Sequence, residues 1–146
     1  IQPVFIDLDM NTVEPAIGAH RMDKVYAWKS MLDMGIHTSG GSDAPVVSFD
    51  AMENIYFAVT RKNISGQPQE GWIPSEKMSV DEAVKLFTKN AAYASYTEKE
   101  NGTIETGKNA DLVVLEKDIY SIDPDEIKTV KVDMTVLGGK VVFERE

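Results

Sequence analysis

The sequence of 146 residues contains no cysteine, so disulfide bonds and thiolate metal sites are excluded. The absence of cysteine is compatible with a reducing compartment, and we expect a cytoplasmic protein. Histidine is also scarce, because His20 and His37 are the only two. Their spacing forms neither an H-x-H nor an H-x-x-x-H pair, so the histidines alone do not predict a metal site.

Basic residues are few, with 15 Lys and Arg against 24 Asp and Glu, which gives a net charge of -9. Nucleic acid binding is disfavoured, because neutralising phosphates requires clustered cations. No apolar run approaches the roughly 20 residues that a membrane span needs. No basic amphipathic face suggests a membrane surface either, and the first residues lack the basic region of a signal peptide. We therefore expect a small-molecule ligand rather than nucleic acid or membrane.

The chain begins at Ile1 without a methionine and opens directly on an apolar run. A processed initiator is one explanation. We favour the other, in which these residues are a piece of a longer protein.

The first 41 residues follow a strand, loop, helix, strand pattern. Residues 4–8 are predicted to form a short buried strand, and a loop follows to residue 20. Apolar residues then recur at helical spacing from Met22 to Leu32, and this helix is expected to end at Gly35. Residues 36–39 are the next candidate strand. Together these elements make a βαβ unit, which implies a pair of parallel strands.

Two more helices are predicted further along. Asp50 can cap a helix that runs to about residue 62. The capping box Ser79-Val80-Asp81-Glu82 opens another helix, with helical packing continuing to about residue 95. Between them, residues 64–75 form a loop rich in glycine and proline that carries Trp72.

The pattern changes near Gly102. Residues 110–115 read as a strand, and residues 131–144 read as a β-hairpin with a two-residue Gly138-Gly139 turn. We therefore divide the chain into an α/β part, residues 1–101, and a β part, residues 102–146.

These elements do not complete a fold. Two parallel strands with about three helices leave sheet edges open, and open edges favour aggregation. A complete (β/α)₈ barrel needs about 250 residues. The α/β part could hold only the last two βα units of such a barrel.

The most informative turn is Gly40-Gly41-Ser42-Asp43-Ala44-Pro45-Val46, which follows the candidate strand at residues 36–39. It presents one carboxylate where a strand ends, and α/β barrels keep their catalytic groups at the carboxyl ends of strands. Asp43 is thus a candidate catalytic residue. The alternative is a turn-capping role, because Ser-Asp before Ala-Pro is ordinary turn chemistry.

Several segments resemble one family, in order along the chain. They are QPV at 2–4, YAWKSMLDMG at 26–35, GSDAPV at 41–46, AVTR at 58–61, EAV at 82–84, NAAYA at 90–94, GTIETGKNADLVVL at 102–115 and LGGKVV at 137–142. Together they resemble the carboxy-terminal part of the amidohydrolase superfamily, specifically its family-3, YtcJ-like metal-dependent hydrolases.

The resemblance implies a partial TIM (β/α)₈ barrel beside part of a small β-sandwich that is built from both chain ends. Residues 1–8 would be the seventh strand, and Gly41-Ser42-Asp43 would end the eighth. It implies that Asp43 contacts a catalytic divalent metal, expected to be zinc as one or two ions, and takes the proton from bound water. The family's H-x-H pair, its bridging acid or modified lysine and its two later histidines are absent from these residues. Phe5 stands where many relatives carry histidine.

Other candidates are weighed individually. Arg21 could hold a substrate carboxylate with its forked guanidinium, although a solvated loop arginine is the competing interpretation. Trp72 could line an apolar substrate pocket or simply pack. Asp7 and Asp9 are more typical of solvated surface than of a cation site. The stretch from Gly102 to Lys108 has the glycine spacing of a phosphate-binding loop, but no Ser or Thr follows the lysine and a strand succeeds it.

The leading hypothesis is a metal-dependent hydrolase that acts on amide or other C–N bonds, of which the isolated chain would be an inactive part. The rival hypothesis is a noncatalytic α/β module that assembles with a second copy of itself or with a partner.

Overall fold

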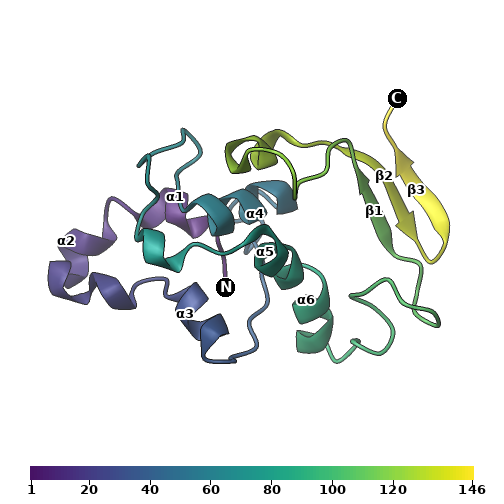
Figure 1. Ribbon diagram of the computed structural model, residues 1–146, viewed down its shortest axis with the longest axis horizontal. Coiled ribbons are helices and arrows are strands. Elements are labelled where there is room, and N and C mark those ends of the chain that lie inside the picture. The colour runs from purple at the N-terminus through teal and green to yellow at the C-terminus, as the bar shows by residue number, and fades with distance from the viewer.

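The computed structural model describes residues 1–146 and has helices at one end and a three-stranded sheet at the other (Figure 1). The helical part contains α1 (Phe5–Asp9), α2 (Val13–Ile17), the 3-10 helix η1 (Ala19–Lys24), α3 (Trp28–Asp33), α4 (Ala51–Thr60), the 3-10 helix η2 (Pro74–Glu76), α5 (Val80–Leu86) and α6 (Lys89–Ala94). The remainder contains β1 (Leu112–Leu115), the 3-10 helix η3 (Pro124–Thr129), β2 (Val132–Leu137) and β3 (Lys140–Glu144).

Helix α4 lies at the centre of the core, and seven of its ten residues are buried: Asn54, Ile55, Tyr56, Phe57, Ala58, Val59 and Thr60. It begins as predicted, because the Asp50 carboxylate accepts the backbone N–H of Met52 at 2.8 Å. It ends at Arg61, which adopts a left-handed backbone with φ of 56°. The helix predicted from Asp50 to about residue 62 is therefore formed, and most of it is buried.

The predicted capping box at the start of α5 is confirmed. The Ser79 hydroxyl accepts the Glu82 N–H at 3.2 Å, and the Glu82 carboxylate accepts the Ser79 N–H at 2.8 Å. The helix does not continue without a break to residue 95. It stops at Leu86, and α6 starts at Lys89 after a Thr88 with non-helical angles.

The predicted hairpin is also confirmed. Strands β2 and β3 pair in antiparallel fashion around Gly138-Gly139, both of which have positive φ, as two-residue hairpin turns require. Strand β1 joins the other edge of β2, also antiparallel. Val113 and Val114 are successive on β1 and point to opposite faces, yet both are about half exposed. Neither face of this sheet is covered.

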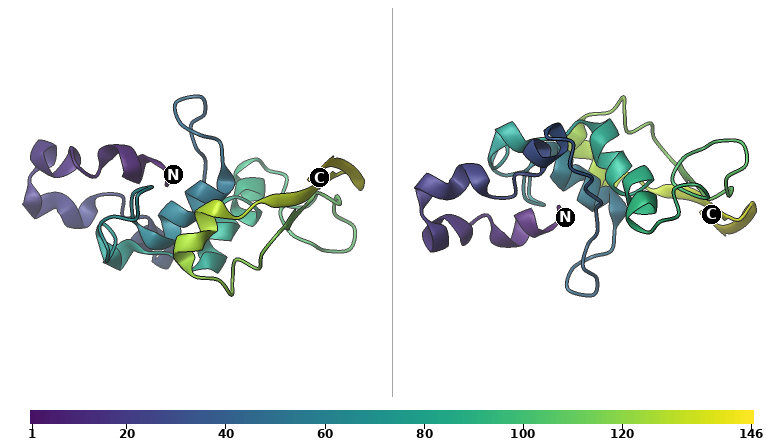
Figure 2. Two further views of the ribbon diagram at one scale, coloured as in Figure 1. Left: turned by 90° about the horizontal axis from the view of Figure 1, so that it is seen from above. Right: turned by 90° about the horizontal axis from the view of Figure 1, so that it is seen from below.

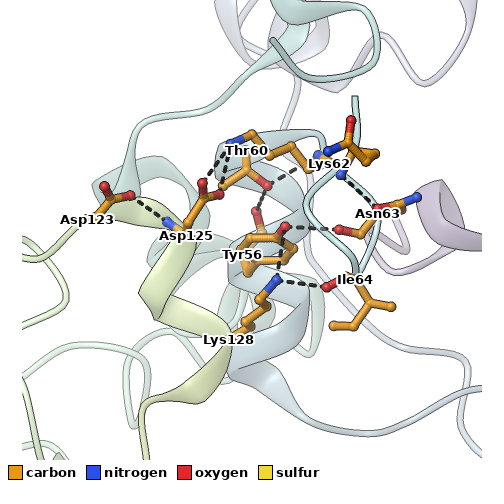
Figure 3. A network of polar contacts seen from close by, with 9 residues as sticks. Tyr56, Thr60, Lys62, Asn63, Ile64, Asp123, Asp125 and Lys128 are labelled. Carbon is orange, nitrogen blue, oxygen red and sulfur yellow. Dashed lines mark hydrogen bonds and ion pairs between the residues drawn. The ribbon is translucent and has the colours of Figure 1, made fainter. Parts of the chain in front are cut away.

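The η3 segment, between β1 and β2 in the chain, lies beside α4, and Figure 3 shows the polar contacts around it. Ile127 on η3 is fully buried in the same hydrophobic core as α4. The Lys62 ammonium pairs with Asp125 at 2.7 Å. The Lys128 ammonium donates to the Ile64 carbonyl at 2.7 Å and lies 4.4 Å from the centre of the Tyr56 ring. One core therefore includes residues from both of the parts that we separated at residue 101.

The strand predicted over residues 4–8 is wrong, because these residues form helix α1. The first turn closes through bonds from the Phe5 N–H to the Gln2 carbonyl and from the Ile6 N–H to the Pro3 carbonyl. Pro3 has a fixed φ that suits the first turn of a helix. No neighbouring strand is available to residues 4–8, so their backbone groups are satisfied within the segment.

The long helix predicted over residues 22–35 is shorter than expected. It divides into η1 and α3, and Tyr26 between them has a positive φ of 47°. Residues 36–39 are extended but make no regular strand. The sequence therefore predicted the apolar positions of this region better than its hydrogen bonding.

The accessible surface is large for the size of the chain. It measures 8831 Å², whereas a compact monomer of the same mass exposes about 7,500 Å². Apolar side chains of the sheet contribute to this excess, namely Val113, Val114, Leu137, Val141, Val142 and Phe143. None of the helices combines the length and the apolar character needed to cross a membrane.

Candidate active-site turn and its surroundings

Asp43 follows an extended segment that pairs with the start of the chain. The Ile1 ammonium donates to the Ser39 carbonyl at 2.8 Å, and the Gly41 N–H donates to the Ile1 carbonyl at 2.9 Å. These two bonds flank Gly40, and this is how a residue is bonded between neighbouring parallel strands. The predicted pairing of residues 4–8 with residues 36–39 is therefore not formed, and the parallel contact consists of a single pair of bonds between Ile1 and the residues on either side of Gly40.

Helices α5 and α6 support this extended segment from one side. The Gly40 N–H donates to the Leu86 carbonyl at 3.0 Å, and the Asn90 amide donates to the Thr38 carbonyl at 2.9 Å. A Cβ at Gly40 would lie 2.6 Å from the Phe87 ring. Any larger residue at position 40 would clash with that ring. The segment that leads to Asp43 therefore packs closely against Phe87.

Asp43 itself is exposed and has a left-handed backbone with φ of 60°. The turn is closed by its main chain, because the Val46 N–H donates to the Asp43 carbonyl at 2.9 Å. The Ser42 hydroxyl accepts the Ala44 N–H at 3.3 Å. These bonds do not use the Asp43 carboxylate, which leaves it available to a ligand. The loop of residues 42–50 projects from the helical body (Figure 2).

The chain does not gather further metal ligands around Asp43. No group of three or more His, Asp or Glu side chains is arranged to hold a metal ion. His37 is exposed and stacks on Tyr93, with 4.3 Å between the ring centres. His20 lies on η1 beside Arg21, and both are exposed. The residues present supply one carboxylate and do not form a metal site by themselves.

The other two sequence candidates lie on different elements. Arg21, on η1, makes no ion pair. Trp72 precedes η2, is partly buried, and packs edge-on against Tyr26 with 5.6 Å between the ring centres. Asp7 and Asp9 bond within the protein, to the Ile64 N–H at 2.8 Å and to the Tyr26 hydroxyl respectively, so the expectation of solvated carboxylates is wrong.

Sequence reasoning missed Arg61, which is completely buried. Its Nε donates to the Trp72 carbonyl and its Nη1 donates to the Tyr26 carbonyl, each at 2.9 Å. The guanidinium lies 5.2 Å from the Trp28 ring centre and 5.5 Å from that of Trp72. The sequence did contain an indication of this role. Arg61 is a charged residue at the end of a strongly apolar helix, and it lies in the sequence between two segments that each carry a tryptophan.

Burial shifts the pKa values of two of these side chains, Arg61 and Tyr26. Desolvation lowers the pKa of Arg61 to about 10, and the nearby Glu76 carboxylate opposes that change. Desolvation, together with the bond to Asp9, raises the pKa of Tyr26 to about 12. At neutral pH Arg61 is therefore charged and the Tyr26 hydroxyl keeps its proton.

Comparison with known proteins identifies the family. The family model described as the amidohydrolase family matches residues 1–143. A Bacillus subtilis (strain 168) protein named as the amidohydrolase YtcJ is 37% identical over 145 residues, which are 99% of this chain and 27% of that protein.

The chain belongs to the amidohydrolase family.

Two further proteins are similar to this chain. An N-substituted formamide deformylase from Arthrobacter pascens is 36% identical over 122 residues, covering 84% of this chain and 22% of that enzyme. The solved structure of an uncharacterized metal-dependent hydrolase from Pyrococcus horikoshii matches with a TM-score of 0.74 at 22% identity, over 85% of this chain and 25% of that one. At that identity the match shows a shared fold alone. The chain spans about a quarter of the length of these amidohydrolase relatives.

Proposed function

We propose that this chain is part of a larger hydrolase that cleaves amide or related C–N bonds, with Asp43 as its catalytic carboxylate. The observation that carries the proposal is the exposed Asp43 carboxylate at the end of an extended segment bonded in parallel fashion to Ile1. The carboxyl end of a parallel strand is where an α/β barrel holds its catalytic groups.

The role proposed for Asp43 is to hold and return one proton. Its carboxylate accepts the proton of the attacking water and gives it to the departing amine nitrogen, so that one group acts first as base and then as acid. The exposed position and the unused carboxylate oxygens suit this role, since both leave room for water and substrate.

A divalent metal, with zinc as the first choice, is proposed for the whole hydrolase. The relatives include a protein named as a metal-dependent hydrolase. A bound metal ion would lower the pKa of water toward neutrality. Asp43 would be one ligand, and because this chain supplies no others nearby, the remaining ligands would have to come from other parts of the larger protein.

The architecture proposed for the larger protein follows from the uncovered surfaces. Residues 1–101 would complete a (β/α)₈ barrel as its last two βα units, and residues 102–146 would contribute to a small β-sandwich. Apolar side chains on both faces of the sheet support this, because such faces are normally covered. The surface in excess of a compact monomer, roughly 1,400 Å², is comparable to what a stable interface buries.

The proposed substrate class is an N-substituted amide. The relative from Arthrobacter pascens is named for N-substituted formamides, and it is 36% identical to this chain. Arg21 would contact a carboxylate on such a substrate, and Trp72 would contact an apolar substituent.

The test is to measure amine release from N-benzylformamide by the full-length protein and by two variants. Asp43→Asn removes the base without changing the size of the side chain, and it should lower turnover by at least about 100-fold. Asp81→Asn alters an exposed carboxylate on α5 that pairs with Lys85, and it should leave turnover within about twofold of wild type. Undiminished turnover by Asp43→Asn would reject the proposal.

A further inference from the structure

An open pocket on the surface of the protein, called the cavity below, lies beside Trp72. It has a volume of about 290 Å³ and is formed by the end of α1 and by the loop between α4 and η2. Its lining consists of Met10, Asn11, Asn63, Gln67, Pro68 and Trp72. None of these side chains ionises, which is unusual in a chain with 39 charged residues and a net charge of -9.

The aromatic wall of this cavity is held firmly in place. The Trp72 N–H donates to the Arg61 carbonyl at 2.6 Å, and the Trp72 carbonyl accepts from Arg61 Nε at 2.9 Å. The buried guanidinium also lies against the Trp72 ring. Because the bonds of Arg61 fix both the backbone and the ring, Trp72 offers a preorganised surface that a ligand need not order.

Three carboxamides face the same cavity. The Asn63 side chain accepts the Gln67 N–H at 2.8 Å, and the Asn63 N–H donates to the Gln67 carbonyl at 2.6 Å, which fixes the loop. The side chains of Asn11 and Gln67 make no hydrogen bond within the protein, so their amide groups are free to donate to and accept from a ligand.

The lining itself offers no charged side chain to bind an ion. An anion would find no cationic side chain in the lining. A cation stacked on Trp72 would be repelled by the Arg61 guanidinium, which already lies 5.5 Å from the centre of that ring. An uncharged ligand avoids both costs.

We propose that this cavity binds a small uncharged ligand that carries an aromatic ring and an amide group. The ring stacks on Trp72, and the amide exchanges hydrogen bonds with the carboxamides of Asn11 and Gln67. This inference builds on the proposed function, because Trp72 is also the proposed contact for an apolar substituent of the substrate, and it adds the ring and the amide that the ligand carries. The test below measures binding alone.

The test uses the full-length protein and three probes that share a benzyl or phenyl ring. They are N-benzylacetamide, benzoate and benzylammonium, which are neutral, negative and positive. Ligand-observed NMR titration should give a Kd for N-benzylacetamide at least about fivefold lower than for either ion. Because no turnover is measured, loss of the hydrolytic proposal would leave this result unchanged.

Matched variants locate the site. Asn11→Ala and Gln67→Ala remove exposed carboxamides that make no internal hydrogen bond, so the fold should be unaffected, and each should raise the Kd for N-benzylacetamide at least about threefold. Gln69→Ala changes an exposed neighbour outside the cavity lining and should leave the Kd unchanged. Equal affinities for the three probes, or a Kd unaffected by both Asn11→Ala and Gln67→Ala, would overturn the proposal.

Discussion

Arg61 connects three segments that are distant in the sequence. Its guanidinium bonds the Tyr26 carbonyl before α3 and the Trp72 carbonyl before η2, while its own backbone ends α4. The buried Glu76 carboxylate favours the charged guanidinium and accepts the Ser30 N–H at 3.0 Å. Nη2 of Arg61 makes no hydrogen bond, so burial of the guanidinium is not fully offset by hydrogen bonds. Arg61 is therefore important for stability mainly because the groups that it pairs with would lose a partner if it were removed.

Replacing Arg61 should therefore be costly. Arg61→Met keeps much of the apolar stem but leaves the Trp72 carbonyl without a donor, removes one of the two donors of the Tyr26 carbonyl, and leaves Glu76 without its nearby positive charge. We expect a loss of about 3–5 kcal/mol in the free energy of unfolding, measured by urea denaturation. Arg61→Lys retains the charge but not the forked geometry and should lose less. A loss below about 1 kcal/mol for Arg61→Met would contradict this account.

Tyr26 should ionise at unusually high pH. Its folded-state pKa of about 12 exceeds the unfolded value of about 10. The associated stabilisation is fully present below pH 10 and is lost as the pH rises through about 12. The lowered pKa of Arg61 acts in the opposite direction over the same range, so stability alone is a poor readout. Absorbance titration at alkaline pH reports the tyrosines directly.

In that titration, one of the five tyrosines should ionise with a midpoint near pH 12. Tyr26→Phe should remove this late phase. If the late phase persists in Tyr26→Phe, the assignment is wrong.

At the scale of elements, sequence patterns correctly predicted the structures that are held by hydrogen bonds between residues close in the sequence. The Asp50 cap, the Ser79 capping box and the Gly138-Gly139 hairpin were predicted, because each element is fixed by bonds between residues close in the sequence. Residues 4–8 were not, because a strand needs a partner and an apolar run alone does not distinguish a strand from a buried helix. Around Asp43, the turn was predictable, whereas the long-range bonds from Ile1 and Asn90 were not.

The extended segment before Asp43 offers a matched pair of glycine variants. A Cβ at Gly40 would lie 2.6 Å from the Phe87 ring, whereas a Cβ at Gly41 would have nothing within 4 Å. Gly40→Ala should lower the free energy of unfolding by about 1–3 kcal/mol through overpacking, as measured by urea denaturation. Gly41→Ala should change it by less than about 0.5 kcal/mol. Similar values for both variants would show that Phe87 moves aside freely.

At the scale of the whole molecule, the chain has more exposed surface than a compact monomer and no cluster of metal-ligand side chains. Its accessible surface of 8831 Å² exceeds that of a compact monomer, and the sheet is uncovered on both faces. The sequence indicated Asp43 alone as a candidate metal ligand, which stays a prediction, and the structure brings no cluster of three or more ligand side chains together. The same surfaces would permit the rival noncatalytic assembly, so binding and turnover measurements have to separate the two.

One such measurement is calorimetry with zinc on the isolated 146-residue chain. A single carboxylate cannot supply the roughly 10–16 kcal/mol of binding free energy typical of complete structural zinc sites. We expect no tight stoichiometric binding, and no amine release from N-benzylformamide. A one-to-one zinc complex of high affinity would show that this chain forms a complete site by itself.

The most direct test of the central claim is chemical rescue of Asp43 in the full-length protein. Asp43→Ala removes the proposed base, so turnover of N-benzylformamide should fall at least about 100-fold while the circular dichroism spectrum stays that of wild type. Added formate, a small carboxylate, should restore part of the lost turnover in proportion to its concentration. Wild-type turnover by Asp43→Ala, or a loss that formate does not reverse in a folded variant, would contradict the role of Asp43 as the catalytic carboxylate.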